Sequence, residues 1–273
     1  MSDMTGNIVN RTSHETSPRF VASRLDAQVQ IPRGKQERFA GYGIMGVPFG
    51  SGHVLAMRRF RSSSLGPGYS SVWHRTPQGD WSFYVDVDPS LACPRYFGSA
   101  LAQTVVADIR LAWADSHKLE VSVPAIGLDW SIKLAATPAT RAINRIGRLI
   151  PERLWHSTAA LSLLSGVAGR LLDAGHISLH GRVPNGQRFI VNPRLLWSVA
   201  SATAVLGRVN LGCPRPLDEQ ERLGDFWIPN RGIFAAGQGY FEPFDAARHQ
   251  TDTSRPTTAH SSRPGQRRSV VAG

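Results

Sequence analysis

The chain has 273 residues, 41% of them hydrophobic and 19% charged, which is typical of a globular protein with a substantial core and some disordered ends. The formal net charge is +11, and five arginines against one aspartate place +4 of it in residues 246–273. No apolar run of about 18 residues or more occurs, and residues 1–20 lack an apolar signal core, so we expect no transmembrane helix and a cytoplasmic location.

The two ends of the chain differ in composition from its middle. Residues 1–20 are polar and rich in Ser and Thr, and residues 246–273 consist mainly of Ser, Thr, Arg, His and Pro. Such segments cannot bury enough apolar surface to fold, so we predict a disordered N-terminus and a disordered basic tail. The folded, β-rich domain is expected to span residues 25–244.

The first part of this domain is predicted to be β structure. The glycine-punctuated segment 41–50 is expected to be a loop with a short strand, and 53–61 is a strand candidate. Residues 69–87 then read YSSVWHRTPQGDWSFYVDV, with Thr76–Asp80 suited to a turn and strand-forming aromatic residues in both arms.

The hairpin 69–87 has two chemically different faces if Trp73 opposes Phe83 and His74 opposes Ser82. Side chains alternate along a strand, so one face carries Ser71, Trp73, Phe83 and Val85. The other face carries Val72, His74, Ser82, Tyr84 and Asp86. A strand pair of this kind suits a position between a core and a polar cavity or solvent.

Three later segments, 104–113, 118–123 and 128–134, alternate apolar and polar residues with period two. They predict an antiparallel meander with one buried face. The pattern changes at Thr137, a suitable N-cap, and Pro138, a suitable first helical residue. A helix over 138–150 and a more apolar one over 152–173, ended by Gly175, are expected to form a helical insert.

After the insert, Asn185-Gly186 predicts a hairpin within 176–191. Segment 194–206 fits a helix or a strand, and β segments are expected at 225–228 and 233–241. The predicted fold class is α+β and predominantly antiparallel β, with a β-barrel or strongly curved sheet and a helical insert at 138–173.

The strongest candidate catalytic group is His74, Tyr84 and Asp86 on one hairpin face. A His and a carboxylate on adjacent strands suit a base and its orienting partner, with Tyr as donor or acid. The alternative is that they face solvent or satisfy one another. The neighbouring strand candidate offers three ligand-binding residues, which are His53, Arg58 and Arg59.

The two cysteines, Cys93 and Cys213, lie outside any CxxC or Cys/His metal pattern. We therefore expect no metal site, and we expect no cofactor because no Walker or Rossmann signature occurs. HExxH and GxSxG signatures are also absent. A disulfide and a reduced pair both stay open for the cysteines.

Three hypotheses about function follow. The first is a β-barrel cavity that binds or transforms a small, apolar, terpenoid-like or lipid-like molecule. The second is a module peripheral to an anionic membrane, which uses 138–173 and an arginine face formed by Arg141, Arg145 and Arg148. An ordinary packed insert explains the same helices. The third is a basic nucleic-acid accessory protein, although no recognisable nucleic-acid module occurs and a specific nucleic-acid partner is not expected.

The layout of the chain resembles a known group of proteins. GYGIMGVPFGSG at 41–52, the hairpin 69–87, the meander and GRVPNGQRF at 181–189 are similar in arrangement to lipocalin-like bacterial proteins of the hydroxyneurosporene-synthase group. The resemblance covers residues 40 to 240 and departs from the group at the helical block 138–173. It implies two β-barrel halves and a cavity for an apolar terpenoid, and it assigns no residue a role.

Overall fold

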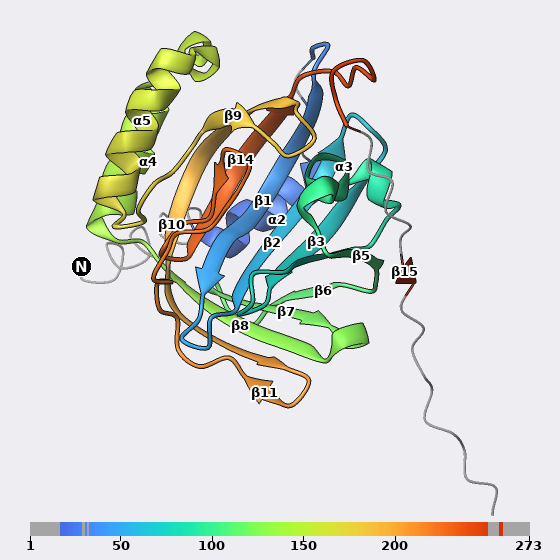
Figure 1. Ribbon diagram of the computed structural model, residues 1–273. Coiled ribbons are helices and arrows are strands. Elements are labelled where there is room, and N and C mark those ends of the chain that lie inside the picture. Colours follow the sequence, from blue (N-terminus) through green and yellow to red (C-terminus); the bar gives the residue numbers. More distant parts are fainter. Residues whose placement is uncertain (1–16, 29–30, 32, 251–256, 259–273) are drawn as a thin grey trace, which may run out of the picture.

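The structure is a computed structural model that describes residues 17–28, 31, 33–250 and 257–258, and gives only the backbone of Arg148, Glu152, Thr257 and Thr258. Its central feature is one strongly curled, mixed sheet (Figure 1). Within the described residues, thirteen strands join it, and the main path runs β15-β5-β4-β3-β2-β1-β14-β10-β8-β7-β6, with β9 and β11 paired to β10. Most strand pairs are antiparallel, whereas β5 pairs in parallel with β4 and β15. The fold is therefore α+β with a predominantly antiparallel, half-barrel sheet, as predicted.

The strands of this sheet have the following bounds: β1 Glu37–Pro48, β2 Val54–Ser63, β3 Pro67–Arg75, β4 Trp81–Val85, β5 Gln103–Val106, β6 Arg110–Trp113, β7 Lys118–Val123, β8 Leu128–Ala135, β9 His180–Arg182, β10 Arg188–Leu206, β11 Val209–Asn210, β14 Ile233–Phe241 and β15 Thr257–Thr258. A separate small pair consists of β12 Arg222–Leu223 and β13 Phe226–Trp227. The α-helices are α2 Pro18–Gln28, α3 Pro94–Phe97, α4 Pro138–Leu149 and α5 Thr158–Leu171. Short 3₁₀ turns lie at Pro89–Leu91, Gly98–Ala100, Pro124–Ile126 and Glu152–His156.

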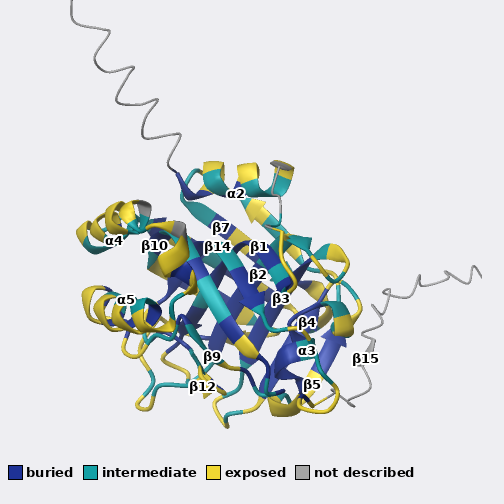
Figure 2. Ribbon diagram, turned by 90° about the horizontal axis from the view of Figure 1, so that it is seen from above, coloured by how far each residue is buried: buried dark blue, intermediate teal, exposed yellow. Residues whose placement is uncertain are grey.

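The hairpin of β3 and β4 has the register that side-chain alternation predicts. Trp73 pairs with Phe83, and His74 pairs with Ser82. Trp73 and Phe83 lie in one buried cluster, and Val72 and Tyr84 lie in another on the opposite face. The sheet thus separates two cores, and Figure 2 shows its central strands buried while α4 and α5 keep exposed surfaces.

The helical insert forms as predicted, with an added break. The side chain of Thr137 accepts a hydrogen bond from the backbone N–H of Thr140, which caps α4. Ser157 caps α5 in the same way, so the second helix begins there, and residues 152–156 form a 3₁₀ turn instead of its first turns. Figure 1 shows both helices beside β9 and β10. Each described helix is either too short or too polar to traverse a bilayer.

Three local predictions differ from the structure. Segment 41–50, expected to be mostly loop, belongs largely to the long strand β1, because its glycines occupy positions where neighbouring strands approach closely. Segment 104–113 is divided at 107–109, and its two halves pair with different strands, β5 with β4 and β6 with β7. The meander therefore consists of β6, β7 and β8. The ambiguous segment 194–206 is part of strand β10.

Parts of the predicted disordered ends are placed by the structure. Residues 18–20 begin α2, and residues 257–258 form β15 beside β5. The imidazole of His249, near the start of the predicted tail, lies 2.8 Å from a carboxylate oxygen of Glu242. Residues 1–16, 251–256 and 259–273, which the same predictions covered, lie outside the described residues.

Candidate functional site

A largely apolar cavity of about 190 Å³ lies between one face of the sheet and helices α4 and α5. The face is the one that carries Trp73, so the aromatic side of the predicted hairpin lines this space. Ile143 of α4 and Leu164 and Ala168 of α5 form part of the opposite wall. Cavities of this kind, apolar with a few polar groups, are the usual form of small-molecule sites.

The floor of the cavity is open because the central strands carry very small residues there. Alternation along β14 directs Ala235, Gly237 and Gly239 to the cavity face. Gly237 pairs with Gly41 of β1, which also lines the cavity. A Cβ atom at Gly239 would meet a single atom within 4 Å, Cγ1 of Val191 at 4.0 Å. Gly239 therefore leaves open space that a longer side chain would fill, whereas an added Cβ at Gly41 or Gly237 would meet the backbone of the neighbouring strand, so glycine there permits close strand approach.

Arg58 is the one formally charged residue among the described residues that line the cavity. Its exposure is 3%, and its guanidinium carbon lies 4.4 Å from the centre of the Trp73 ring, a cation–π contact. The guanidinium donates hydrogen bonds to the carbonyls of Ile44, Met45 and Met57. Burial lowers the pKa of Arg58 to about 10, so it stays charged at neutral pH.

A β-bulge in β1 lies at two of these carbonyls, those of Ile44 and Met45. The register of β1 against β2 shifts between Ile44 and Val47, so residues 45 and 46 are left out of the ladder. A bulge disrupts local pairing and turns backbone groups away from the neighbouring strand. The carbonyl of Met45 within the bulge and that of Ile44 beside it accept hydrogen bonds from Arg58.

Beside Arg58 lies a small cluster of neutral polar groups. The thiol of Cys93 is 3.2 Å from the hydroxyl of Tyr69 and 3.6 Å from that of Ser71, and Trp73 donates its indole N–H to Ser71 at 3.2 Å. Burial raises the pKa of the Cys93 thiol and raises that of Tyr69 well above its ordinary value. Both groups therefore stay protonated at neutral pH.

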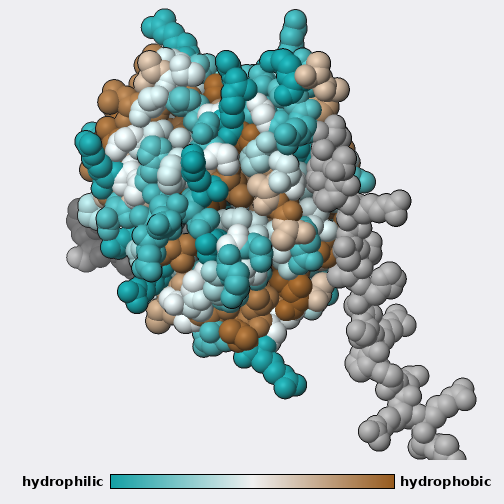
Figure 3. All heavy atoms as spheres, in the orientation of Figure 1, coloured by the Kyte–Doolittle hydropathy of each residue, from teal (hydrophilic) through white to brown (hydrophobic). Residues whose placement is uncertain are grey.

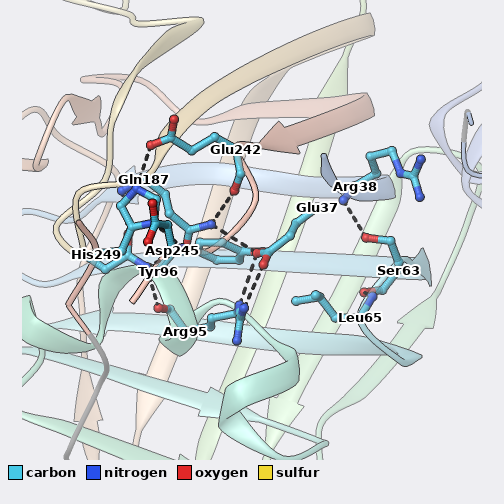
Figure 4. Close-up of polar contacts among 12 residues, drawn as sticks. Glu37, Arg38, Ser63, Leu65, Arg95, Tyr96, Gln187, Glu242, Asp245 and His249 are labelled. Carbon is cyan, nitrogen blue, oxygen red and sulfur yellow. Dashed lines mark hydrogen bonds and ion pairs between the residues drawn. The ribbon is translucent and has the colours of Figure 1, made fainter. Parts of the chain in front are cut away.

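A largely buried hydrogen-bond network around Glu37 includes Tyr96, which lines the cavity (Figure 4). Arg95 binds the carboxylate of Glu37 through two nitrogens, at 2.7 and 3.1 Å, and Tyr96 donates to it at 2.5 Å. Gln187 also donates to Glu37, and to the carbonyl of Glu242 at 2.6 Å. Burial alone would raise the pKa of Glu37, but the hydrogen bonds from Arg95 and Tyr96 outweigh it and hold that pKa below its usual range.

This network joins β1, α3, the β9–β10 turn and the segment after β14. The ring of Tyr96 stacks on Phe241 with centroids 3.8 Å apart, and both residues line the cavity. The network therefore fixes the position of an aromatic wall.

The residues predicted to be catalytic share one face but have different partners. His74 is buried, and its Nε2 lies 2.8 Å from Nδ1 of His53. Asp86 accepts from the backbone N–H of Ser70 at 2.7 Å. Burial raises the pKa of Tyr84. None of the three predicted residues is among the described residues that line the cavity, and their catalytic role stays a prediction.

The residues predicted to bind ligand separate in a similar way. Arg58 lines the cavity, whereas His53 contacts His74. Arg59 points to the opposite face, where its guanidinium lies 3.4 Å from Asp26 and 2.7 Å from the hydroxyl of Ser70. In the predicted arginine patch, Arg141 and Arg145 are exposed on α4, and the side chain of Arg148 lies outside the described part.

The structure adds lining residues that the sequence did not single out for binding. Tyr69 and Cys93 stand 24 positions apart in the sequence, and no spacing rule connects them. The signal that was available is the hairpin's alternation, which placed Ser71 and Trp73 on this face. Among the described residues, no group of three or more His, Cys, Asp or Glu side chains has the arrangement of a metal site.

Comparison with known proteins assigns no family. No protein family and no curated protein matches the sequence. One similar solved structure is acetoacetate decarboxylase from Legionella pneumophila subsp. pneumophila str. Philadelphia 1, with a TM-score of 0.38 and 11% identity, covering 83% of this chain and 91% of that chain. Another is a second acetoacetate decarboxylase structure, with a TM-score of 0.38 and 11% identity, covering 84% of this chain and 96% of that chain. A likeness at this level assigns no activity to this chain.

Proposed function

We propose that this protein binds a small, largely apolar molecule in the cavity between the sheet and helices α4 and α5. The observation that carries the proposal is the glycine-floored hollow itself. Gly41, Gly237 and Gly239 line its floor, with open space at Gly239, while Trp73 and Phe241 supply aromatic walls. Transfer of an apolar molecule from water into an apolar space of this kind is favourable, because it removes apolar surface from water.

The volume limits the size of the occupant. An apolar protein cavity of about 150 Å³ is large enough to hold benzene. The cavity of about 190 Å³ therefore suits one ring or a short hydrocarbon chain with a head group. The terpenoid-like and lipid-like molecules expected from the sequence include members of this size.

A cavity-filling substitution tests the proposal. Gly239→Leu directs a branched side chain into the hollow, and its Cβ has room. Gly166→Leu is the matched control, because Gly166 is exposed on α5, outside the cavity lining, with no atom within 4 Å of an added Cβ. We expect native mass spectrometry of protein from its own cells to show a retained small molecule in the wild type and in the control. Equal retention by Gly239→Leu would contradict the proposal.

A specific observation favours a second candidate, docking on an anionic membrane. Six of the nine large hydrophobic side chains that are exposed in the described chain lie between residues 146 and 171: Ile146, Leu149, Leu154, Leu163, Val167 and Leu171. The sequences of α4 and α5 contain arginines and no Asp or Glu. In Figure 3, brown spheres adjoin teal ones at the upper left, where Figure 1 places these helices. Apolar side chains with basic neighbours suit the surface of an anionic bilayer.

Vesicle flotation tests this candidate. We expect binding to phosphatidylcholine vesicles that contain phosphatidylglycerol, and weaker binding to phosphatidylcholine alone, because the arginines add electrostatic attraction. Leu149→Ser should reduce binding, since Leu149 is 77% exposed. Val209→Ser, which alters an exposed valine on β11, is the matched control. Equal losses in both variants would contradict a role for the helices.

A further inference from the structure

We propose that the molecule bound in the cavity is a carboxylate, and that its charged group pairs with Arg58 while its apolar part lies over the glycine floor. This inference rests on the proposed function and adds the chemical class of the ligand. Arg58 lines the cavity and stacks on Trp73, so its guanidinium lies at the edge of the apolar space. A planar guanidinium matches a carboxylate through two parallel hydrogen bonds.

The charge of Arg58 lacks an anionic partner within the described protein. No described Asp or Glu oxygen lies within 4.0 Å of its guanidinium nitrogens, and the acceptors of its hydrogen bonds are backbone carbonyls, which carry partial charges. A buried charge without a counter-charge is costly to fold. A bound anion would remove much of that cost, so the free protein is already arranged to favour one.

Three other partly buried arginines of this sheet and its borders each pair with a carboxylate. Arg59 pairs with Asp26, and Arg95 with Glu37. Arg75 pairs with Glu221. The side chains of these three arginines are between 13% and 25% exposed, so each is less buried than Arg58 and each has a carboxylate. Arg58 differs from these three because it is more buried, has no carboxylate within the described residues and lines the cavity.

The nearby polar groups cannot replace that anion. Cys93 and Tyr69 stay protonated because burial raises the pKa of both. The thiol and the hydroxyl are hydrogen-bonded to each other at 3.2 Å, and no acidic residue is among the described lining residues. The cavity therefore combines an apolar interior with a single positive end, which is complementary to an amphipathic anion.

Matched ligands test the inference on the wild-type protein. Octanoate and 1-octanol share a chain, and 3-phenylpropanoate and 3-phenylpropan-1-ol share a ring, so each pair differs mainly in charge. Hydrogen bonds to charged groups contribute enough for us to expect each acid to bind about ten- to a hundredfold more tightly than its alcohol, measured by isothermal titration calorimetry. Equal affinities would overturn the carboxylate and leave the cavity proposal standing. No binding of any of the four would overturn both.

Substitutions then assign the preference to Arg58. Arg58→Met keeps a long apolar side chain, and we expect it to bind the alcohols while losing the preference for acids. Arg58→Lys keeps the charge, and we expect it to retain part of the preference. Arg61→Met is the control, since Arg61 is an exposed residue of the same strand outside the cavity lining. Circular dichroism checks folding, and if Arg58→Met does not fold, Arg58→Lys together with the wild-type comparison decides. An unchanged preference in a folded Arg58→Met variant would overturn the assignment.

Discussion

Acidification should destabilise this protein through His74. Burial, and secondarily the nearby charge of His53, lower the pKa of His74 from its ordinary value of 6.5 to about 4. Below pH 6.5 the unfolded chain binds a proton at this imidazole while the folded protein does not, so the unfolded state is favoured as pH falls. The stability that the neutral His74 contributes to the folded protein is fully present above pH 6.5 and is lost as the pH falls from 6.5 to about 4. Below that pH it does not change further.

The size of the effect follows from the same two pKa values. A difference of about 2.5 between them, at about 1.4 kcal/mol for each pKa unit, corresponds to about 3.4 kcal/mol once the loss is complete. By pH 5.0 the expected loss is about 2 kcal/mol, because about 1.5 of those pH units have been crossed. This is a large part of the stability of an ordinary domain, so it is measurable.

Urea titrations followed by tryptophan fluorescence, at intervals between pH 7.5 and 5.0, measure the loss directly. His74→Gln should flatten the dependence, because glutamine does not titrate. His53→Gln should reduce it only in part, since His53 is the smaller cause of the lowered pKa and burial remains. If His74→Gln keeps the full slope of the wild type, the protonation argument is wrong.

Four further results are expected. Trp73→Ala should cost about 3–5 kcal/mol in a denaturant titration, because the ring is buried and stacks on Phe83 at 4.1 Å; a cost near zero would contradict its place in the core. Glu37→Gln should cost about 2 kcal/mol, less than for a fully buried pair, since it leaves the partly buried Arg95 without its carboxylate, and calorimetric melting measures it. Asn144→Ala should cost about 1–2 kcal/mol and speed amide exchange in α4, because its side chain makes two hydrogen bonds to the backbone of Leu196. His74→Ala should leave the affinity for the cavity ligand unchanged, because His74 lies on the sheet face opposite the cavity, and a lost affinity in a folded variant would contradict that placement.

The hairpin of β3 and β4 was predictable because its information is local. The turn at 76–80 sets the register, and strict alternation sends Trp73 and His74 to opposite faces. The helix caps at Thr137 and Ser157 are local too, since a hydroxyl side chain satisfies the first free N–H groups of a helix. Only the first of these caps was anticipated, because the break at 152–156 interrupts an otherwise continuous apolar pattern.

The errors occurred where long-range pairing overrides local pattern. Residues 104–113 alternate throughout, yet they form two separate strands, because β5 pairs with β4 and β6 pairs with β7. The glycines of β1 have the composition of a loop, but at Gly41 the neighbouring strand is so close that an added Cβ would meet the carbonyl oxygen of Arg59. Such contacts join residues far apart in sequence, and no short window contains them.

The candidate site, too, combines features set by local sequence with features set by long-range packing. The sequence by itself determined the two-faced hairpin, the capped helix at 138 and the mostly antiparallel architecture, because turns, caps and alternation act over a few residues. It also named Arg58 as a ligand-binding residue, though for a site on the other side of the sheet. Only the tertiary structure decided that Arg58, Tyr69 and Cys93 meet beside a hollow floored by Gly237 and Gly239, since that meeting depends on how β1, β2, β3 and β14 align and on where α4 and α5 cover them.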